Sequence, residues 1–154
     1  MVAIGKRKVR EAVKKVLEKC NLPNDEKKST ELIYRRYNDM AKRNKKGDIT
    51  DTWKIHDFIE WFLKAEKCSY CGCELNTLQK FYGITKKQNK RPTRGNSLEV
   101  DRKKDKPYSA DNCCLACYWC NNAKTDVFTH EEFKPIGKAI GNVIRERISG
   151  NQGR

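Results

Sequence analysis

Apolar residues recur at helical spacing in three segments near the N-terminus. They predict amphipathic helices over 9–20, 32–41 and 55–63, because residues three and four positions apart share a helix face. The first segment stops before Asn21 and Pro23, residues typical of a helix end. The third is rich in aromatic residues, and its spacing favours a core-facing helix over a surface that stacks on bases.

The pattern changes in the second half of the chain to short apolar runs between polar stretches. Residues 97–102 and 113–119 have strand character and are separated by a polar loop, so they predict two strands. Residues 121–128 predict a short helix. A last helix is predicted to begin at Thr129, whose hydroxyl can form a capping box with the Glu132 carboxylate.

Composition argues against a membrane-spanning or exported protein. Only 37% of the 154 residues are apolar, and no stretch approaches the roughly 18 consecutive apolar residues that a membrane helix needs. The N-terminus also lacks the apolar segment of a signal peptide. We therefore expect a soluble, unexported protein without a membrane partner.

The chain carries 34 Lys and Arg against 20 Asp and Glu, a formal net charge of +14 at neutral pH. This excess predicts a nucleic-acid partner, because Lys and Arg that neutralise phosphates release condensed counterions. A merely soluble surface is the alternative, but such surfaces usually mix both signs. The segment from Leu75 to Leu98 has no acidic residue, and we predict that it is a loop that contacts phosphate. Its basic residues are Lys80, Lys86, Lys87, Lys90, Arg91 and Arg94.

Four of the eight cysteines form two CxxC pairs, Cys68 with Cys71 and Cys117 with Cys120. Four thiolates at this paired spacing can provide the tetrahedral shell of a structural zinc ion. Disulfides and free buried thiols are less favoured alternatives, since tight CxxC disulfides are usually redox-active. Cys73 is a distant alternative ligand. The cysteines outside the pairs are interpreted as small buried residues: Cys20, Cys73, Cys113 and Cys114.

Polar residues between the two pairs indicate a second site. Asp101 ends the first predicted strand, and Asn121 directly follows the second cysteine pair at the start of the short helix. A carboxylate oxygen and an amide oxygen are hard ligands that could hold one divalent cation with open positions for phosphate and water. Alternatively, Asp101 pairs with a nearby lysine at the surface and Asn121 is a helix cap.

The order CSYCG, VDR, Asn112, LACYWCN and Lys124 resembles the HNH, or ββα-metal, endonuclease family over residues 68 to about 128. The resemblance implies a small core of two strands and a helix that cleaves DNA with a divalent cation. One residue departs from the pattern, because Arg102 stands where HNH nucleases usually have a histidine. A guanidinium cannot deprotonate water at neutral pH, so the nucleophile must be activated by another group.

With this departure, the sequence resembles rare-cutting restriction enzymes of the family, in which a tyrosine takes over the role of this histidine. The string LEVDRKKDKPYSADNCCLACYWCNNAK and the later GKAI carry the resemblance. It implies that Asp101 and Asn121 bind Mg²⁺ or a similar cation. It also implies that Tyr108 starts strand cleavage, that Arg102 clamps the phosphate and that Asn112 holds the loop. The expected DNA-contacting residues are Lys86, Lys87, Lys90, Arg91, Arg94, Lys103, Lys104 and Lys124.

Some assignments keep an alternative from the residues alone. In the segment PYSADN, Tyr108 would otherwise be an ordinary turn residue. His56, beside the third predicted helix, is the reserve candidate for the missing base. His130 lies in the capping box and is expected to be exposed.

The pattern and the resemblance together predict an α+β protein with a zinc-bound ββα-metal core. Residues 1–67 form a helical region for DNA binding and support, 68–128 the nuclease core, and 129–154 a C-terminal helix and tail. The expected function is sequence-specific cleavage of double-stranded DNA by a homodimeric restriction enzyme in the cytoplasm of a bacterial or phage-infected cell. A phage or homing HNH nuclease is one alternative, and a non-catalytic zinc-ribbon protein that binds nucleic acid is another.

Overall fold

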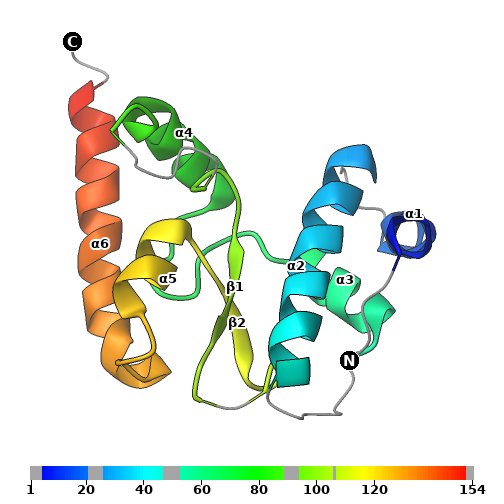
Figure 1. Cartoon of the computed structure of the whole chain (residues 1–154). Helices are drawn as coiled ribbons and strands as arrows, with labels where there is room; N and C mark the ends of the chain where they lie inside the picture. Colours follow the sequence, from blue (N-terminus) through cyan, green and yellow to red (C-terminus); the bar gives the residue numbers. More distant parts are fainter. Residues whose placement is uncertain (1–4, 21–25, 47–52, 89–93, 106, 152–154) are drawn as a thin grey trace. The chain divides into compact units, whose positions relative to one another are not determined.

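The computed structural model describes residues 5–20, 26–46, 53–88, 94–105 and 107–151 (Figure 1). In chain order the elements are α1 (Lys6–Cys20), α2 (Glu26–Lys46), α3 (Ile55–Leu63), α4 (Leu75–Thr85), β1 (Glu99–Arg102), β2 (Cys113–Ala116), α5 (Tyr118–Lys124) and α6 (His130–Asn151). Contacts divide the chain into two compact units. The helical unit is Met1–Ala65 with Lys106–Cys113, and the cysteine unit is Glu66–Asp105 with Cys114–Arg154. None of the helices in these ranges is both long and apolar enough to span a bilayer.

The helical unit is held together by apolar side chains on the facing sides of α1, α2 and α3. Val9 from α1, Ile33 from α2 and Phe58 from α3 are completely buried. Trp53 meets Phe58 edge-on, with ring centroids 5.2 Å apart. Its carbonyl accepts a 2.9 Å hydrogen bond from the Tyr37 hydroxyl. The three predicted helices are confirmed, and the aromatic stripe of the third faces the core.

The cysteine unit contains a two-stranded sheet of β1 and β2 with helices around it. Helix α5 contacts β1, and α4 and α5 both contact α6 (Figure 1). The second predicted strand is shorter than expected, because Cys117 ends it by capping α5: its sulfur accepts a 3.4 Å hydrogen bond from the Cys120 backbone N–H. The predicted α+β class is confirmed.

The segment from Leu75 to Leu98 was predicted to be a loop, and this prediction is wrong for its first half. Residues Leu75–Thr85 form α4. Leu78 and Phe81 are buried at helical spacing, so the apolar signal for a helix was present among the basic and amide residues. Lysines 80, 86 and 87 are exposed on or after this helix.

Helix α6 begins with the predicted capping box and lies unusually close to the first cysteine pair. Thr129 N donates to a Glu132 carboxylate oxygen at 2.9 Å, and Glu132 N donates to the Thr129 hydroxyl at 3.3 Å. Further along, Gly137 and Gly141 face the segment around Cys71. A Cβ added at Gly141 would stand 2.5 Å from the Cys71 carbonyl oxygen. The absence of side chains at these positions allows the close approach.

Gly141→Ala is therefore expected to destabilise the protein. Overpacking costs about 1–3 kcal/mol, and this contact is with backbone, which has little freedom to move. Gly150→Ala is the matched control in the same helix, where an added Cβ meets nothing within 4 Å. There alanine should stabilise by up to about 1 kcal/mol through helix propensity. Thermal or urea unfolding measures both, and equal effects of the two variants would contradict the close packing.

Candidate metal centres and active site

Four buried thiols of the cysteine unit converge on one point. The Sγ atoms of Cys68, Cys71, Cys117 and Cys120 all lie within 4.8 Å of one another, and those of Cys71 and Cys117 are 3.8 Å apart. Four sulfurs bound tetrahedrally at about 2.3 Å from one zinc would stand about 3.8 Å apart. The donor set and its spacing therefore fit a structural zinc ion. Within the described ranges no cysteine forms a disulfide.

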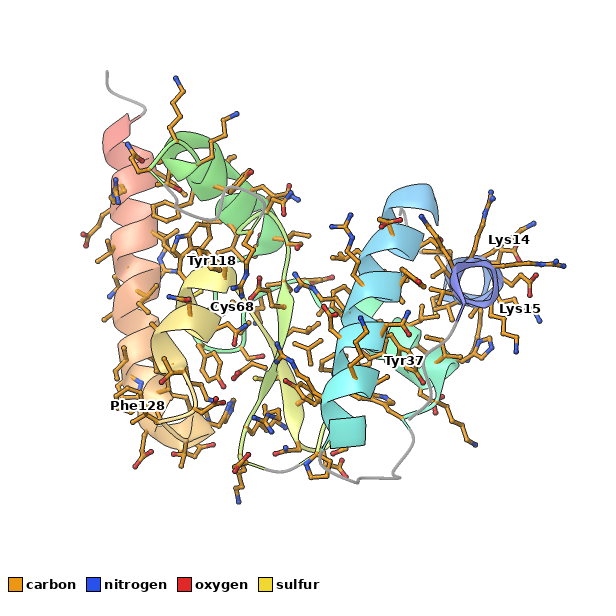
Figure 2. The ribbon with its side chains drawn as sticks, in the orientation of Figure 1. Lys14, Lys15, Tyr37, Cys68, Tyr118 and Phe128 are labelled. Atoms are coloured by element: carbon orange, nitrogen blue, oxygen red, sulfur yellow. The ribbon has the colours of Figure 1, made fainter. Side chains whose placement is uncertain are left out.

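The backbone around the two pairs presents the sulfurs to each other. Gly72 has a φ of +66°, a left-handed conformation that lets the chain turn directly after Cys71. The sulfur of Cys68, whose side chain is labelled in Figure 2, accepts a hydrogen bond at 3.2 Å from the Cys117 backbone N–H at the start of α5. Hydrogen bonds from the other thiols, that of Cys117 above all, hold the pKa of Cys68 well below its ordinary value. The thiolate, the form that zinc binds, is thus favoured at Cys68, whereas hydrogen bonds with neighbouring thiols, that of Cys117 above all, raise the pKa of Cys71 and of Cys120.

The remaining cysteines lie outside this cluster. Cys73, Cys113 and Cys114 are buried and Cys20 is half-buried, which agrees with their interpretation as small packed residues. Burial raises the pKa of Cys73 to about 12, and its sulfur accepts a hydrogen bond from Arg145 at 3.5 Å. Cys73 therefore has partners of its own and is not grouped with the zinc-binding set.

Asp101 lies on the face of β1 that α5 covers. Its side chain is nearly buried, and its Oδ2 accepts a 2.5 Å hydrogen bond from the Tyr70 hydroxyl. The Lys124 ammonium from α5 lies 3.4 Å from the same oxygen. Burial raises the pKa of Asp101, while Tyr70 and Lys124 oppose this effect. The carboxylate is thus fixed by a neutral donor and a cation on one of its two oxygens.

The Asn121 side chain is held by a network of neighbouring polar side chains. Its Nδ2 donates to Glu99 Oε2 at 2.8 Å, so its carbonyl oxygen is left as the ligand atom. Glu99 is buried and forms a bidentate ion pair with Arg94, whose guanidinium also lies over the Tyr118 ring, 4.6 Å from its centroid. Glu99 and Asp101 are two positions apart on one strand, so their side chains point to the same face of the sheet. Both proposed ligands consequently belong to the contact between β1 and α5.

Tyr108 and Asn112 belong to the helical unit. Tyr108 is buried, and its hydroxyl accepts a 2.6 Å hydrogen bond from Arg43 on α2. The Asn112 amide donates to the Pro107 carbonyl at 3.0 Å, and its backbone N–H donates to the Ser109 hydroxyl at 3.3 Å. These bonds hold the loop that carries Tyr108, the role expected for Asn112.

This fold of a small sheet with covering helices has a counterpart among solved structures. No protein-family model matches the chain, and no curated protein matches it. A solved structure matches with a TM-score of 0.61 and 25% sequence identity, covering 75% of this chain and 80% of the other. The fold resembles that of PacI. PacI is a rare-cutting HNH restriction endonuclease with an extraordinary mechanism of DNA perturbation. The similarity to PacI supports a nuclease-like function.

The basic residues expected to contact DNA differ in their placement on this PacI-like fold. Lys86, Lys87 and Lys104 are exposed, and Lys103 is half-buried. Lys90 and Arg91 lie outside the described residues. Arg102 is partly exposed and forms ion pairs with Asp105 at 3.2 Å and Asp126 at 3.5 Å.

Two expected DNA contacts are instead engaged within the protein. The Lys124 side chain is only 4% exposed, and its ammonium donates to the Arg102 carbonyl at 2.9 Å. Arg94 holds Glu99. Lys124 therefore supports Asp101 rather than presenting a surface charge.

Sequence reasoning missed three residues that contact candidate site residues or their partners. Arg43 on α2 reaches Tyr108 in the loop before β2, and Tyr70, between Cys68 and Cys71, reaches Asp101. His130 was expected to be exposed, but its side chain is 17% exposed and its Nδ1 lies 3.2 Å from the Tyr70 hydroxyl. Burial lowers the pKa of His130, so the neutral ring is favoured. Local patterns hold no signal for these contacts, because 31 to 65 residues separate the partners.

Proposed function

We propose that this protein is a divalent-metal-dependent endonuclease that hydrolyses phosphodiester bonds in double-stranded DNA, and specifically a PacI-like type II restriction enzyme. The observation that supports the proposal is the contact of β1, which carries Asp101, with α5, which carries Asn121 and begins at the four-cysteine cluster, in a fold similar to PacI. The net charge of +14 suits a DNA partner. A homodimer in the cytoplasm of a bacterial or phage-infected cell is part of the proposal, since palindromic sites suit two-fold symmetric proteins.

Asp101 and Asn121 would hold the cation, Mg²⁺ or a similar ion, through one carboxylate and one amide oxygen. When bound, this ion supplies Lewis-acid stabilisation of the charge that develops on the scissile phosphate and on the leaving 3′ oxygen. Arg102 replaces the usual HNH histidine and cannot act as a base. Its partly exposed guanidinium is instead suited to clamp the phosphate.

Tyr108 is proposed to start cleavage at the phosphorus or at an attacking water. Its hydroxyl already accepts a hydrogen bond from the permanently charged Arg43, at 2.6 Å. A guanidinium at this position stabilises negative charge that develops on the phenol oxygen. Arg43 is therefore proposed to support Tyr108 in this role.

The direct test is to incubate the purified, zinc-loaded protein with plasmid and phage DNA, with Mg²⁺ or Mn²⁺ and with EDTA. Cleavage that requires the cation is expected, and sequencing the ends will give the recognition sequence and the positions of the cuts. Uniform ends at a palindrome support a restriction enzyme. Retarded DNA in gel-shift experiments without cleavage under any cation, across many DNAs, would overturn the enzyme proposal in favour of a zinc-ribbon binding protein.

Arg43→Ala is expected to slow cleavage about 10-fold. A hydrogen bond to a charged group contributes about 1.5–3 kcal/mol. The low end of this range applies because Arg43 is exposed. Since about 1.36 kcal/mol corresponds to a factor of ten in rate, the expected loss is about 10-fold. Single-turnover cleavage measures the effect, with Arg43→Lys expected to recover part of the rate. In the Tyr108→Phe background the same substitution should change little. An equal loss in both backgrounds would mean that Arg43 acts independently of Tyr108.

A further inference from the structure

The Tyr70 hydroxyl is the centre of a hydrogen-bonded chain that ends on Asp101. Its single proton is directed to Asp101 Oδ2 at 2.5 Å. The hydroxyl oxygen can therefore accept a hydrogen bond, and His130 Nδ1 stands 3.2 Å away. The Cys114 thiol is a second, weaker donor at 3.5 Å. The direction of the chain is thus from His130 through Tyr70 to the carboxylate.

Helix α6 holds Tyr70 in this position through residues on one of its faces. The His130 and Tyr70 rings have centroids 5.1 Å apart, and the Phe133 ring meets the Tyr70 ring edge-on at the same centroid distance. One turn later Gly137 leaves room for Tyr70, because a Cβ there would stand 2.6 Å from the Tyr70 Cβ. The helix therefore fixes both the ring and the hydroxyl of Tyr70.

The protein contacts on Asp101 leave one oxygen of its carboxylate for a metal ion. Tyr70 and the Lys124 ammonium both approach Oδ2, at 2.5 and 3.4 Å. An ion bound through the other carboxylate oxygen would keep both protein contacts in place. Hydrogen bonds of this kind set the orientation of a ligand, and their loss typically costs 10–100-fold in metal affinity or activity.

We propose that Tyr70, aligned by His130, is a positioning residue that fixes the Asp101 carboxylate for the divalent cation of the nuclease. The inference rests on the proposed function, because it takes Asp101 as a cation ligand. This proposal assigns helix α6, through His130, a role in the cation site. Neither the CxxC pairs nor the strand that carries Asp101 predicts this role. Tyr70 touches neither the ion nor the DNA in this arrangement and acts only through Asp101.

The test compares Tyr70→Phe with the wild type in the zinc-loaded, full-length protein. Mn²⁺ affinity is measured by calorimetry or electron paramagnetic resonance, and cleavage is measured as a function of Mg²⁺ concentration. Tyr70→Phe is expected to weaken Mn²⁺ binding about 10-fold, the low end for such contacts. Saturating Mg²⁺ should restore most of the maximal rate, which general damage to the fold would not allow. Tyr34→Phe, which also removes one phenol oxygen, should leave both quantities unchanged.

His130 provides a second and independent variant that keeps Tyr70 in place. His130→Ala removes the donor and should weaken Mn²⁺ binding in the same direction but less. His130→Asn retains an N–H near the Nδ1 position and should recover part of the affinity. If Tyr70→Phe loses zinc or fails to fold, these two variants decide the question, and equal Mn²⁺ affinities for His130→Ala and wild type overturn the inference.

Asp101→Asn separates this inference from the function on which it rests. If Asp101→Asn abolishes Mn²⁺ binding and cleavage while Tyr70→Phe binds and cleaves like the wild type, the positioning role is wrong and the endonuclease proposal stands. If Asp101→Asn itself binds Mn²⁺ and cleaves normally, Asp101 is not a cation ligand. Both the proposed cation site and the positioning role of Tyr70 are then overturned.

Discussion

Asp101→Asn is expected to lower the rate of DNA cleavage by at least ~10³-fold. The substitution keeps the shape of the side chain but removes the negative charge that would hold the cation between β1 and α5. A bound metal contributes several kcal/mol of transition-state stabilisation, and each 1.36 kcal/mol is a factor of ten in rate. Plasmid nicking followed over time in Mg²⁺ measures the loss.

The folding of this variant must be measured beside its activity. Asp101 is the counter-charge of the Lys124 ammonium, which lies 3.4 Å away and is only 4% exposed. Removing one partner of a buried ion pair costs about 3–5 kcal/mol, so the melting temperature should fall as well.

A second ligand variant separates the two effects. Asn121→Ala removes a neutral candidate ligand that donates a hydrogen bond to Glu99, and it should also lose cleavage with a smaller effect on unfolding. Asp39→Asn, on the exposed side of α2, is the charge-matched control and should cleave like the wild type. Wild-type rates for both Asp101→Asn and Asn121→Ala would contradict the proposed cation site.

Zinc removal is expected to unfold the cysteine unit. The cluster joins the segment around Cys71 to the start of α5, and α6 packs against the same segment at Gly141. Structural zinc contributes an apparent free energy of about 10 kcal/mol or more, comparable with the whole stability of a small domain. Far-UV circular dichroism and a zinc-sensitive dye, followed as chelator is added, should report loss of structure and release of one ion together.

Cys71→Ser and Cys73→Ser form a matched pair for this prediction. Both are buried cysteines of the same turn, but only Cys71 belongs to the four-sulfur cluster. Cys71→Ser should lower the zinc content and the chelator concentration at which the unit unfolds. Cys73→Ser should retain one zinc per chain. Zinc loss from Cys73→Ser as severe as from Cys71→Ser would show that the ligand set is wrong.

Much of the architecture can be predicted from local patterns. The helices around Val13, Ile33 and Phe58 follow from apolar spacing, because a helix brings residues three and four apart onto one face. The capping box at Thr129 is equally local. Helix α4 differs from the predicted loop because Leu78 and Phe81 have helical spacing and bury one face of the segment despite its basic charge.

The four-cysteine cluster and the candidate cation site can be predicted from the sequence to different degrees. Two CxxC pairs predict their own ligand set, since four thiolates have few arrangements around one metal. Asp101 and Asn121 are candidate ligands by residue type and by resemblance. The orientation of their side chains was not, because Tyr70, Lys124 and Glu99 approach from other elements.

The sequence by itself determined the helical periodicity, the four sulfurs, the excess positive charge and the candidate ligands, since each depends on residue type and short-range spacing. Only the tertiary structure decided which residues support the site. Arg43 meets Tyr108 across 65 positions, and His130 meets Tyr70 across 60. Such pairs are selected by the packing of whole helices, and no periodicity within either segment encodes them. Lys124 turned inward for the same reason: its helix lies on the strand that carries Asp101.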